Sequence, residues 1–541
     1  MMQAPSRSMP LYSDSEYVDD IPLLLGYFQR LQLPQLIDST FLHTFQAESK
    51  NIGILTALWL SHILSQSQHQ SRHLRSWIAS HPETLRRYAP TFTHMSGAND
   101  VYLREVLHIF ANDKYWAIFE SALNRHITQQ YMLKTSRVRL ETCSALWYIN
   151  TDGSLQIDSE RRWRSGTTYV RMAYGILEPS NIPLTMNFSF GNDKHEDLVV
   201  EVVKHIRSSL TEPLIFIGNG ALSHTVRDTI RQNRDRYLGL LSKAELAHNL
   251  AELSSEVQPI FQTADQGLAS IAEGYERRVQ LSSTDPQQEI CEERQLYLRR
   301  HDVVQEQTAD LRERVQVACH EIMELTQPKR GKRRLETLED LHKAAQEISA
   351  SYDVVGLVEI SCQEDLAART IRRYRGRPTT TRVNHLFHIS AHLNEQAFTE
   401  RLKELGWNVY VTTLEAQLLG FRDLLEMPNT SSPFIQRLNE RQLSILPGVI
   451  QRPEHMRGTV RLLSLALRCL ALLDYASTAH GSANDGMATA YSGDEFLRCF
   501  HNLTLTTVYD GCQEHRHLTA LSTRQRHMLD ILGLPYSLYQ I

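Results

Sequence analysis

The chain has 541 residues, of which 42% are apolar and 22% charged, and its formal net charge is −5. At roughly 100–200 residues per domain, this length predicts three or four globular domains. The composition is that of an ordinary globular protein, which excludes a disordered or fibrous chain. The weakly negative charge excludes a global basic field, so any affinity for nucleic acid must come from local patches.

The first 133 residues have a helical pattern. Apolar residues recur at three- and four-residue spacing from Ile21 to Leu31, after Asp19 and Asp20 as candidate caps and with Pro22 in the first turn. Further helix-sized segments are 52–63, 72–78, 101–111 and 115–126. We expect residues 1–133 to form a compact helical N-terminal domain, and DNA binding is one possible role for it.

The pattern changes to short β-type runs at Val138. Three runs joined by turns predict an antiparallel meander, and an amphipathic helix, a fully apolar strand, a second helix and a further strand follow. These segments are 145–149, 168–174, 184–190, 198–210, 214–217, the helix from about 225, and 237–241. Residues 134–243 therefore predict the first part of an α/β core.

Residues 244–384 differ from their surroundings in composition. Glu, Gln, Arg and Leu dominate residues 276–324, which predicts long solvated helices, and residues 352–360 have a β-like pattern. Two basic runs in this region could bind phosphates, and the second contains an aromatic ring that could stack on a base. Their residues are Lys329, Arg330, Lys332, Arg333 and Arg334 in the first, and Arg372, Arg373, Tyr374, Arg375 and Arg377 in the second. We interpret the region as a mainly helical insertion with some strand, and solvated charged loops are the alternative reading of the two runs.

The core pattern resumes in residues 385–475. Strand-like runs at 386–389 and 407–413 precede a long apolar helix at 458–475. Residues 476–541 read as a poorly patterned linker followed by a helical tail.

Cysteine usage and the absence of targeting signals predict a cytoplasmic protein. The seven cysteines include no CxxC pair, as expected for reduced thiols, and residues 1–17 lack the features of a signal peptide. The most apolar run, Leu462–Leu473, contains Arg468 and is shorter than the roughly 20 residues that a membrane span needs.

Several short segments occur in an order and spacing that resembles one known family. They are 19–24, 175–179 with 182–184, 191–192 with 196–197, 406–413, 443–447 and 458–472. Together they resemble the DDE transposases of bacterial insertion sequences, in the IS-four-like superfamily, over about residues 18–539. The resemblance implies an α/β fold with a ribonuclease H-like mixed-sheet core, which agrees with the order strand–strand–strand–helix–strand–helix.

The resemblance also implies a metal-dependent chemistry. In this family two aspartates and a glutamate hold two divalent ions, Mg²⁺ or Mn²⁺, which activate a nucleophile and stabilise the leaving oxygen at a phosphodiester. Carried over to this chain, the three acids fall on Glu141, Asn219 and Ser432, with Ser431 as the alternative to the last. Glu141 alone keeps a carboxylate, so formal charge at the triad falls from −3 to −1. We therefore expect a degenerate triad, with Glu141 as a weak metal ligand at most.

Three functions remain open. The first is a transposase-family protein that binds the double-stranded terminal inverted repeats of an element, as a possible homodimer, with strand transfer lost or impaired. The second is an active enzyme that uses Glu141 with relocated acids. The nearest such acids are Asp152, Asp158, Asp193, Asp197 and Glu426. The third is a non-catalytic interaction scaffold that reuses the fold.

Overall fold

The computed structural model describes most of the chain. The described residues are 12–41, 51–67, 71–90, 100–149, 155–158, 168–190, 194–242, 245, 257–264, 267–281, 291–327, 337–371, 380–427, 453–484, 491–510 and 513–540. The chain folds into two compact units, one of residues 1–239 and 428–541 and the other of residues 240–427. Both combine helices with strands, so the predicted mixed α/β class is confirmed.

The N-terminal part of the first unit is helical, as predicted. Its helices are α1 (Ile21–Arg30), α2 (Leu33–Phe41), α3 (Ile52–Gln66), α4 (Ser71–Ala79), α5 (Pro82–Tyr88), α7 (Asp100–Phe110) and α8 (Asp113–Gln130). Asp20 stands at the N-cap of α1 with Pro22 in the first turn, although its side chain makes no capping hydrogen bond. Apolar residues of these helices are almost fully buried, among them Leu24, Leu58 and Phe119.

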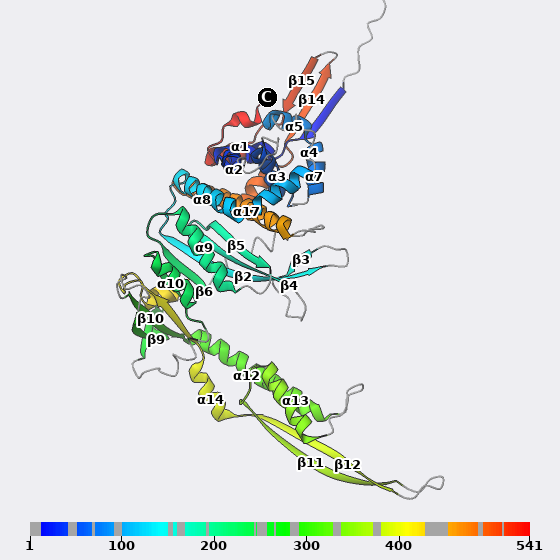
Figure 1. The fold of residues 1–541 in the computed structure, drawn as a ribbon, viewed down its shortest axis with the longest axis vertical. Coiled ribbons are helices and arrows are strands. Elements are labelled where there is room, and N and C mark those ends of the chain that lie inside the picture. The colour runs from blue at the N-terminus through cyan, green and yellow to red at the C-terminus, as the bar shows by residue number, and fades with distance from the viewer. Residues whose placement is uncertain are drawn as a thin grey trace, which may run out of the picture. The chain divides into compact units, whose positions relative to one another are not determined.

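A mixed sheet forms the centre of the first unit (Figure 1). Its strands are β2 (Arg137–Ile149), β3 (Leu155–Asp158), β4 (Thr168–Glu178), β5 (Ile182–Phe190), β6 (Ile215–Ala221) and β7 (Arg236–Leu240). The strand order is β5-β4-β2-β6-β7, with β3 also paired to β2. Strands β2, β4 and β5 form the predicted antiparallel meander, whereas β6 runs parallel to β2.

Helix α9 (His195–Ser209) covers one face of this sheet, and α10 (His224–Gln232) follows β6. The helix buries Leu198, Val202 and Ile206. It lies so close to β4 that a Cβ on Gly175 would come within 2.2 Å of Ile206 Cδ1, which explains a glycine at this position. Apart from the short strand β3, which the sequence does not predict, the succession of three strands, helix, strand, helix and strand is the predicted one.

The C-terminal segment completes the helical part of the first unit instead of forming a linker. Helix α17 runs from Pro453 to Asn484, beyond the predicted end, and packs against α7, α3 and β5. The elements after it are α18 (Gly493–Cys499), β14 (Thr504–Asp510), β15 (Gln513–Leu518), α19 (Thr523–Ile531) and a 3-10 helix, η3 (Tyr536–Tyr539). Strand β14 pairs with β15 and with the N-terminal strand β1 (Tyr12–Tyr17), so the two ends of the chain share one small sheet (Figure 1).

Helix α17 is long and apolar enough in its His455–Ala479 segment to cross a membrane by composition alone. However, 72% of that apolar window is buried inside the protein, against the neighbouring helices and β5. Packing in the protein core therefore accounts for its apolar composition.

The second unit holds more strand than the sequence predicts. The region expected to be mainly helical includes β8 (Gln258–Ala264), β9 (Gly267–Leu281), β10 (Cys291–Arg300) and β11 (Val358–Ile371). The end of β9 and all of β10 fall within residues 276–324, where long solvated helices are expected, whereas residues 301–323 are helical as predicted. Strand β10 also pairs with β13 (Trp407–Thr412). The prediction is wrong there because Glu, Arg and Gln are good helix formers, and cross-strand pairing overrides that preference.

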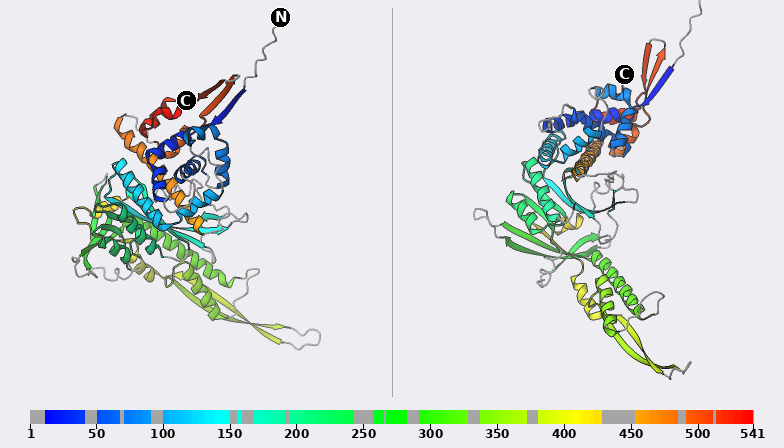
Figure 2. Two further views of the ribbon diagram at one scale, coloured as in Figure 1. Left: turned by 45° about the horizontal axis from the view of Figure 1, so that its top comes forward. Right: turned by 45° about the vertical axis from the view of Figure 1, so that its right-hand side comes forward.

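Helices of the second unit pack beside a long two-stranded ribbon. The helices are α12 (His301–Met323), η2 (Glu324–Thr326), α13 (Leu338–Ser351), α14 (Glu395–Glu404) and the short α15 (Phe421–Glu426). Leu311, Val315, Ile322 and Phe398 belong to the apolar core that these helices share with the ribbon. The ribbon pairs β11 with β12 (Thr380–Leu393) over fourteen residue pairs, and both views of Figure 2 show it in yellow-green.

Candidate functional site

Two of the three triad positions lie beside each other in the sheet of the first unit. Leu140 of β2 is paired in register with Gly218 of β6, so Glu141 and Asn219 are the next residues along two parallel neighbouring strands. Residues paired in this way have side chains on the same face of a sheet. On the other side of β2, Glu141 is paired with Tyr174 of β4. The core fold therefore brings Glu141 and Asn219 together, as the resemblance implies.

The Glu141 carboxylate is buried and bound by an arginine. Arg139 is two residues earlier on β2 and so shares the same face, and its Nε donates to Glu141 Oε1 at 2.6 Å. The other guanidinium nitrogens of Arg139 reach the β4–β5 connection. Nη1 donates to Glu178 Oε1 at 2.6 Å and Nη2 donates to Asn181 Oδ1 at 3.1 Å. The Glu141 side chain is 1% exposed, so this carboxylate lies inside an ion-pair network of the protein.

A thiol on β2 and a phenol on β4 lie next to Glu141 in this row of polar side chains. Cys143 Sγ lies 2.8 Å from Tyr174 Oη. Burial raises the pKa of the Cys143 thiol, and the nearby negative charge of Glu141 raises it further. Burial likewise raises the pKa of Tyr174 well above its ordinary value. Both groups therefore stay neutral at physiological pH, so they offer a divalent cation no anionic ligand.

The end of β6 has a different environment. Asn219 and Gly220 are exposed, and Ser223 caps helix α10 by accepting from the backbone N–H of Val226. Glu196, in the first turn of α9, receives hydrogen bonds from the hydroxyl groups of Thr225 and Ser223, which lower its pKa. Sequence reasoning missed this contact because α9 and α10 are separated in the chain and only their packing brings the two helix starts together.

The donor atoms near Glu141 do not fit a pair of divalent ions. Mg²⁺ and Mn²⁺ require several oxygen ligands, preferably anionic ones, converging on one point. Here the one carboxylate of the triad positions in the described sheet is buried against a guanidinium, whereas the neighbouring Asn219 is neutral and exposed. Within the residues that the structure describes, no group of three or more His, Cys, Asp or Glu is arranged to hold a metal.

The structure does not place the other predicted site residues next to Glu141 and Asn219. Ser432 and Ser431 lie outside the described residues, as do both basic runs, 329–334 and 372–377. In the chain the first run separates η2 from α13, and the second separates β11 from β12. Of the candidate substitute acids, Asp197 is exposed in the first turn of α9, where it stabilises the helix dipole, and Asp152 and Asp193 are not described. Glu426 ends α15 of the second unit.

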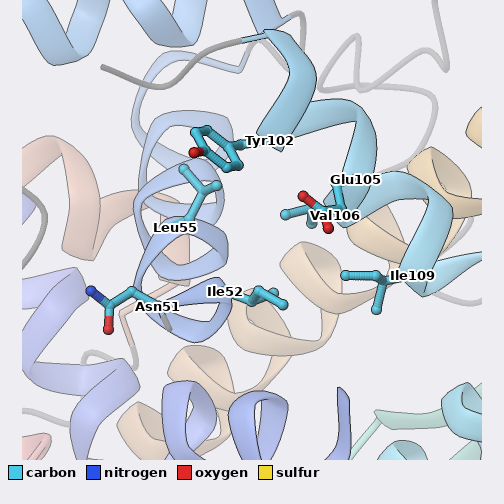
Figure 3. A pocket seen from close by; sticks show the side chains of 7 residues that line it. All are labelled: Asn51, Ile52, Leu55, Tyr102, Glu105, Val106 and Ile109. Atoms are coloured by element: carbon cyan, nitrogen blue, oxygen red, sulfur yellow. The ribbon is translucent and has the colours of Figure 1, made fainter. Parts of the chain in front are cut away.

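A small pocket in the helical part of the first unit is unrelated to this row of residues. It has an empty volume of about 250 Å³ and lies between α3 and α7 (Figure 3). Its lining is mostly apolar, with Ile52, Leu55, Val106 and Ile109, and the polar lining residues are Asn51, Tyr102 and Glu105. Glu105 is the one carboxylate among these lining residues, and Tyr102 is the other titratable group.

A scan against models of protein families finds no match to this chain, and a search of the curated proteins finds no similar sequence. Function must therefore be argued from the residues and their geometry.

Proposed function

We propose that the chain is a DNA-binding member of the insertion-sequence transposase superfamily that has lost the metal-dependent strand-transfer activity. One observation carries this proposal. The two triad positions that the structure describes are neighbours on parallel strands β2 and β6, yet one is a neutral amide and the other is held by Arg139.

The architecture of the first unit supports the transposase kinship. A ribonuclease H-like core has the succession strand, strand, strand, helix, strand, helix. Strands β2, β4 and β5, helix α9, strand β6 and helix α10 follow it, with the short β3 added between β2 and β4. In this fold the metal-binding acids come from neighbouring strands. The positions of Glu141 and Asn219 fit that requirement, so the sequence alignment of the first two acids agrees with the geometry.

Charge supports the loss of activity. Three acids would bring −3 to two ions of total charge +4, whereas Glu141 brings −1 and is already paired with a guanidinium. An active enzyme that uses Glu141 with relocated acids would need other carboxylates around it. The candidate Asp197 and its neighbour Glu196 lie in the first turn of α9, where the Glu196 carboxylate accepts hydrogen bonds from Thr225 and Ser223.

Local basic charge supports DNA binding. The segment 369–382, which includes the connection between β11 and β12, contains six arginines and no acid. A two-stranded ribbon of fourteen pairs is roughly 45 Å long, so it can carry such a run well away from the helices at its base. We propose that this run and residues 329–334 contact the phosphates of double-stranded terminal repeats, with Tyr374 stacking on a base. A homodimer and a cytoplasmic location belong to the same proposal.

A salt titration of DNA binding tests the proposal. The variant replaces Arg372, Arg373, Arg375 and Arg377 with serine, and the matched control replaces Arg401 and Lys403 of α14, which pair with Glu404 and Glu400. Each lost phosphate contact should reduce the slope of log K against log salt by about 0.9. We expect the run variant to lose up to about four contacts and the control none. A wild-type chain that gives no gel shift at low salt would instead favour the interaction scaffold.

A plasmid-nicking assay tests the inactive site. With Mn²⁺ as the more permissive ion, we expect no nicking by the wild-type chain. Robust nicking that disappears in Glu141→Ala would establish the active alternative and refute the proposed loss of activity.

A further inference from the structure

The cation that neutralises the Glu141 position belongs to the protein itself. We propose that Arg139 is a built-in counter-ion that takes the place of the divalent metals, so that this part of β2 is a buried structural ion-pair network. The proposed function identifies position 141 as a former metal ligand, but the network itself rests on contacts that do not depend on it.

The geometry of Arg139 fits a bridging role. Its three guanidinium nitrogens each contact a different side chain, at 2.6 Å for Glu141, 2.6 Å for Glu178 and 3.1 Å for Asn181. Glu178 ends β4 and Asn181 belongs to the turn before β5. A single planar group thus joins the middle of β2 to the connection between two other strands, which a metal ion held by Glu141 alone could not do.

Burial explains why a permanent positive charge is needed there. The side chains of Arg139, Glu141 and Glu178 are 14%, 1% and 23% exposed. A carboxylate as buried as Glu141 is costly unless it has an opposite charge and hydrogen bonds. Arginine stays protonated at every physiological pH, and unlike a metal ion it does not have to bind from solution, so Arg139 neutralises Glu141 permanently.

The same geometry excludes a metal from Glu141 while Arg139 is in place. A divalent ion that approached Oε1 would face the guanidinium at hydrogen-bonding distance from that oxygen and would be repelled. It would also have to reach a carboxylate side chain that is 1% exposed. Binding would require Arg139 to leave, which would in turn strip Glu178 and Asn181 of their partner.

Thermal unfolding of a double-mutant cycle tests this role. The single variants are Arg139→Gln and Glu141→Gln, and the double variant carries both. We expect Arg139→Gln to lower Tm by several degrees because it leaves a buried carboxylate without a counter-ion, and the double variant to recover most of that loss. Arg137→Gln is the matched control, since Arg137 is exposed and lies two residues earlier on the same strand. We expect it to leave Tm unchanged. Additive losses in the cycle would overturn the proposal.

Manganese binding to the wild-type chain supplies the second readout. Electron paramagnetic resonance of Mn²⁺ in the presence of the protein should show no bound ion that depends on Glu141. A bound ion that disappears in Glu141→Gln would overturn the proposal. If Arg139→Gln does not fold, Glu178→Gln, which removes the charge from one contact of Arg139, takes its place. It should lower Tm by a smaller amount, and an unchanged Tm would count against the bridge. Failure of DNA binding would refute the proposed function without altering either readout, because the gel shift depends on the 369–382 run.

Discussion

Arg468 offers the sharpest test of how the first unit is held together. It is in α17, its side chain is 2% exposed, and it faces Glu120 of α8, which is 4% exposed. Arg468 Nη2 donates to Glu120 Oε1 at 3.1 Å and to the carbonyl oxygen of Leu184, while Nη1 donates to Asn124 Oδ1 at 3.2 Å. Thr185 of β5 donates to the other Glu120 oxygen at 2.7 Å. One buried pair therefore joins two helices and the edge of the sheet.

Replacing Arg468 with methionine keeps the apolar stem and removes the charge. Glu120 would remain buried beside an apolar group, and breaking a buried pair in this way costs about 3–5 kcal/mol in the free energy of unfolding. The double variant Arg468→Met, Glu120→Met should recover most of the loss, because it buries no unpaired charge. The effect can be measured by urea unfolding followed by circular dichroism.

The control variant is Arg457→Met, on the same helix. Arg457 pairs with Asp113 at 2.6 Å, but the side chains are 41% and 65% exposed, so the expected cost is below about 1 kcal/mol. An Arg468→Met variant that loses no more than this control would refute the reasoning that the buried pair stabilises the unit.

Three further predictions concern the same unit. Gly458→Ala should lower the free energy of unfolding in urea by about 2 kcal/mol or more. A Cβ at position 458 would lie 2.0 Å from the backbone oxygen of Leu107 and would force α17 away from α7. A variant as stable as the wild-type chain would show that the two helices can separate freely. Burial raises the pKa of Asp113, but Arg461 and Arg457 outweigh it and hold the pKa below its usual range. The stability that the Asp113 carboxylate contributes is therefore present above its pKa in the unfolded chain and is lost as the pH falls through its pKa in the folded chain. Between about pH 5 and pH 3, the free energy of unfolding should thus fall less for Asp113→Asn than for the wild-type chain. Burial raises the pKa of Cys469 to about 12, so iodoacetamide at pH 8 should leave Cys469 unmodified in the native chain and modify it in urea, as read by peptide mass spectrometry; rapid native modification would contradict its burial.

The elements with strong periodicity were predicted well from the sequence. The apolar spacing in Ile21–Leu31 and the continuous apolar run before Gly218 correspond to helix α1 and to the central strand β6, as predicted, and they bury Leu24, Phe28 and Phe216. The proximity of Glu141 and Asn219 was implied by the family resemblance alone, because β2 and β6 are separated in the chain by three further strands and α9.

Other features could not be predicted because they depend on distant partners. Strand β10 is composed largely of helix-forming residues and is stabilised by pairing with β9 and with β13. The segment after Ala476 has weak periodicity, yet β14 finds its partner in β1, nearly five hundred residues earlier. Local propensity is a small energy per residue, and such long-range pairing exceeds it.

By itself, the sequence determined that positions 141, 219 and 432 hold Glu, Asn and Ser, the charge of the two basic runs, and the type of strongly periodic elements such as α1, α3 and α9. Those properties belong to single residues or to local periodicity, which need no knowledge of the fold. Only the tertiary structure decided what the remaining acid does. Glu178 and Asn181 are 39 and 42 residues from Arg139 in the chain, and they meet its guanidinium because β2 and β4 are antiparallel neighbours. Arg139 in turn pairs with Glu141, because a buried carboxylate requires an opposite charge.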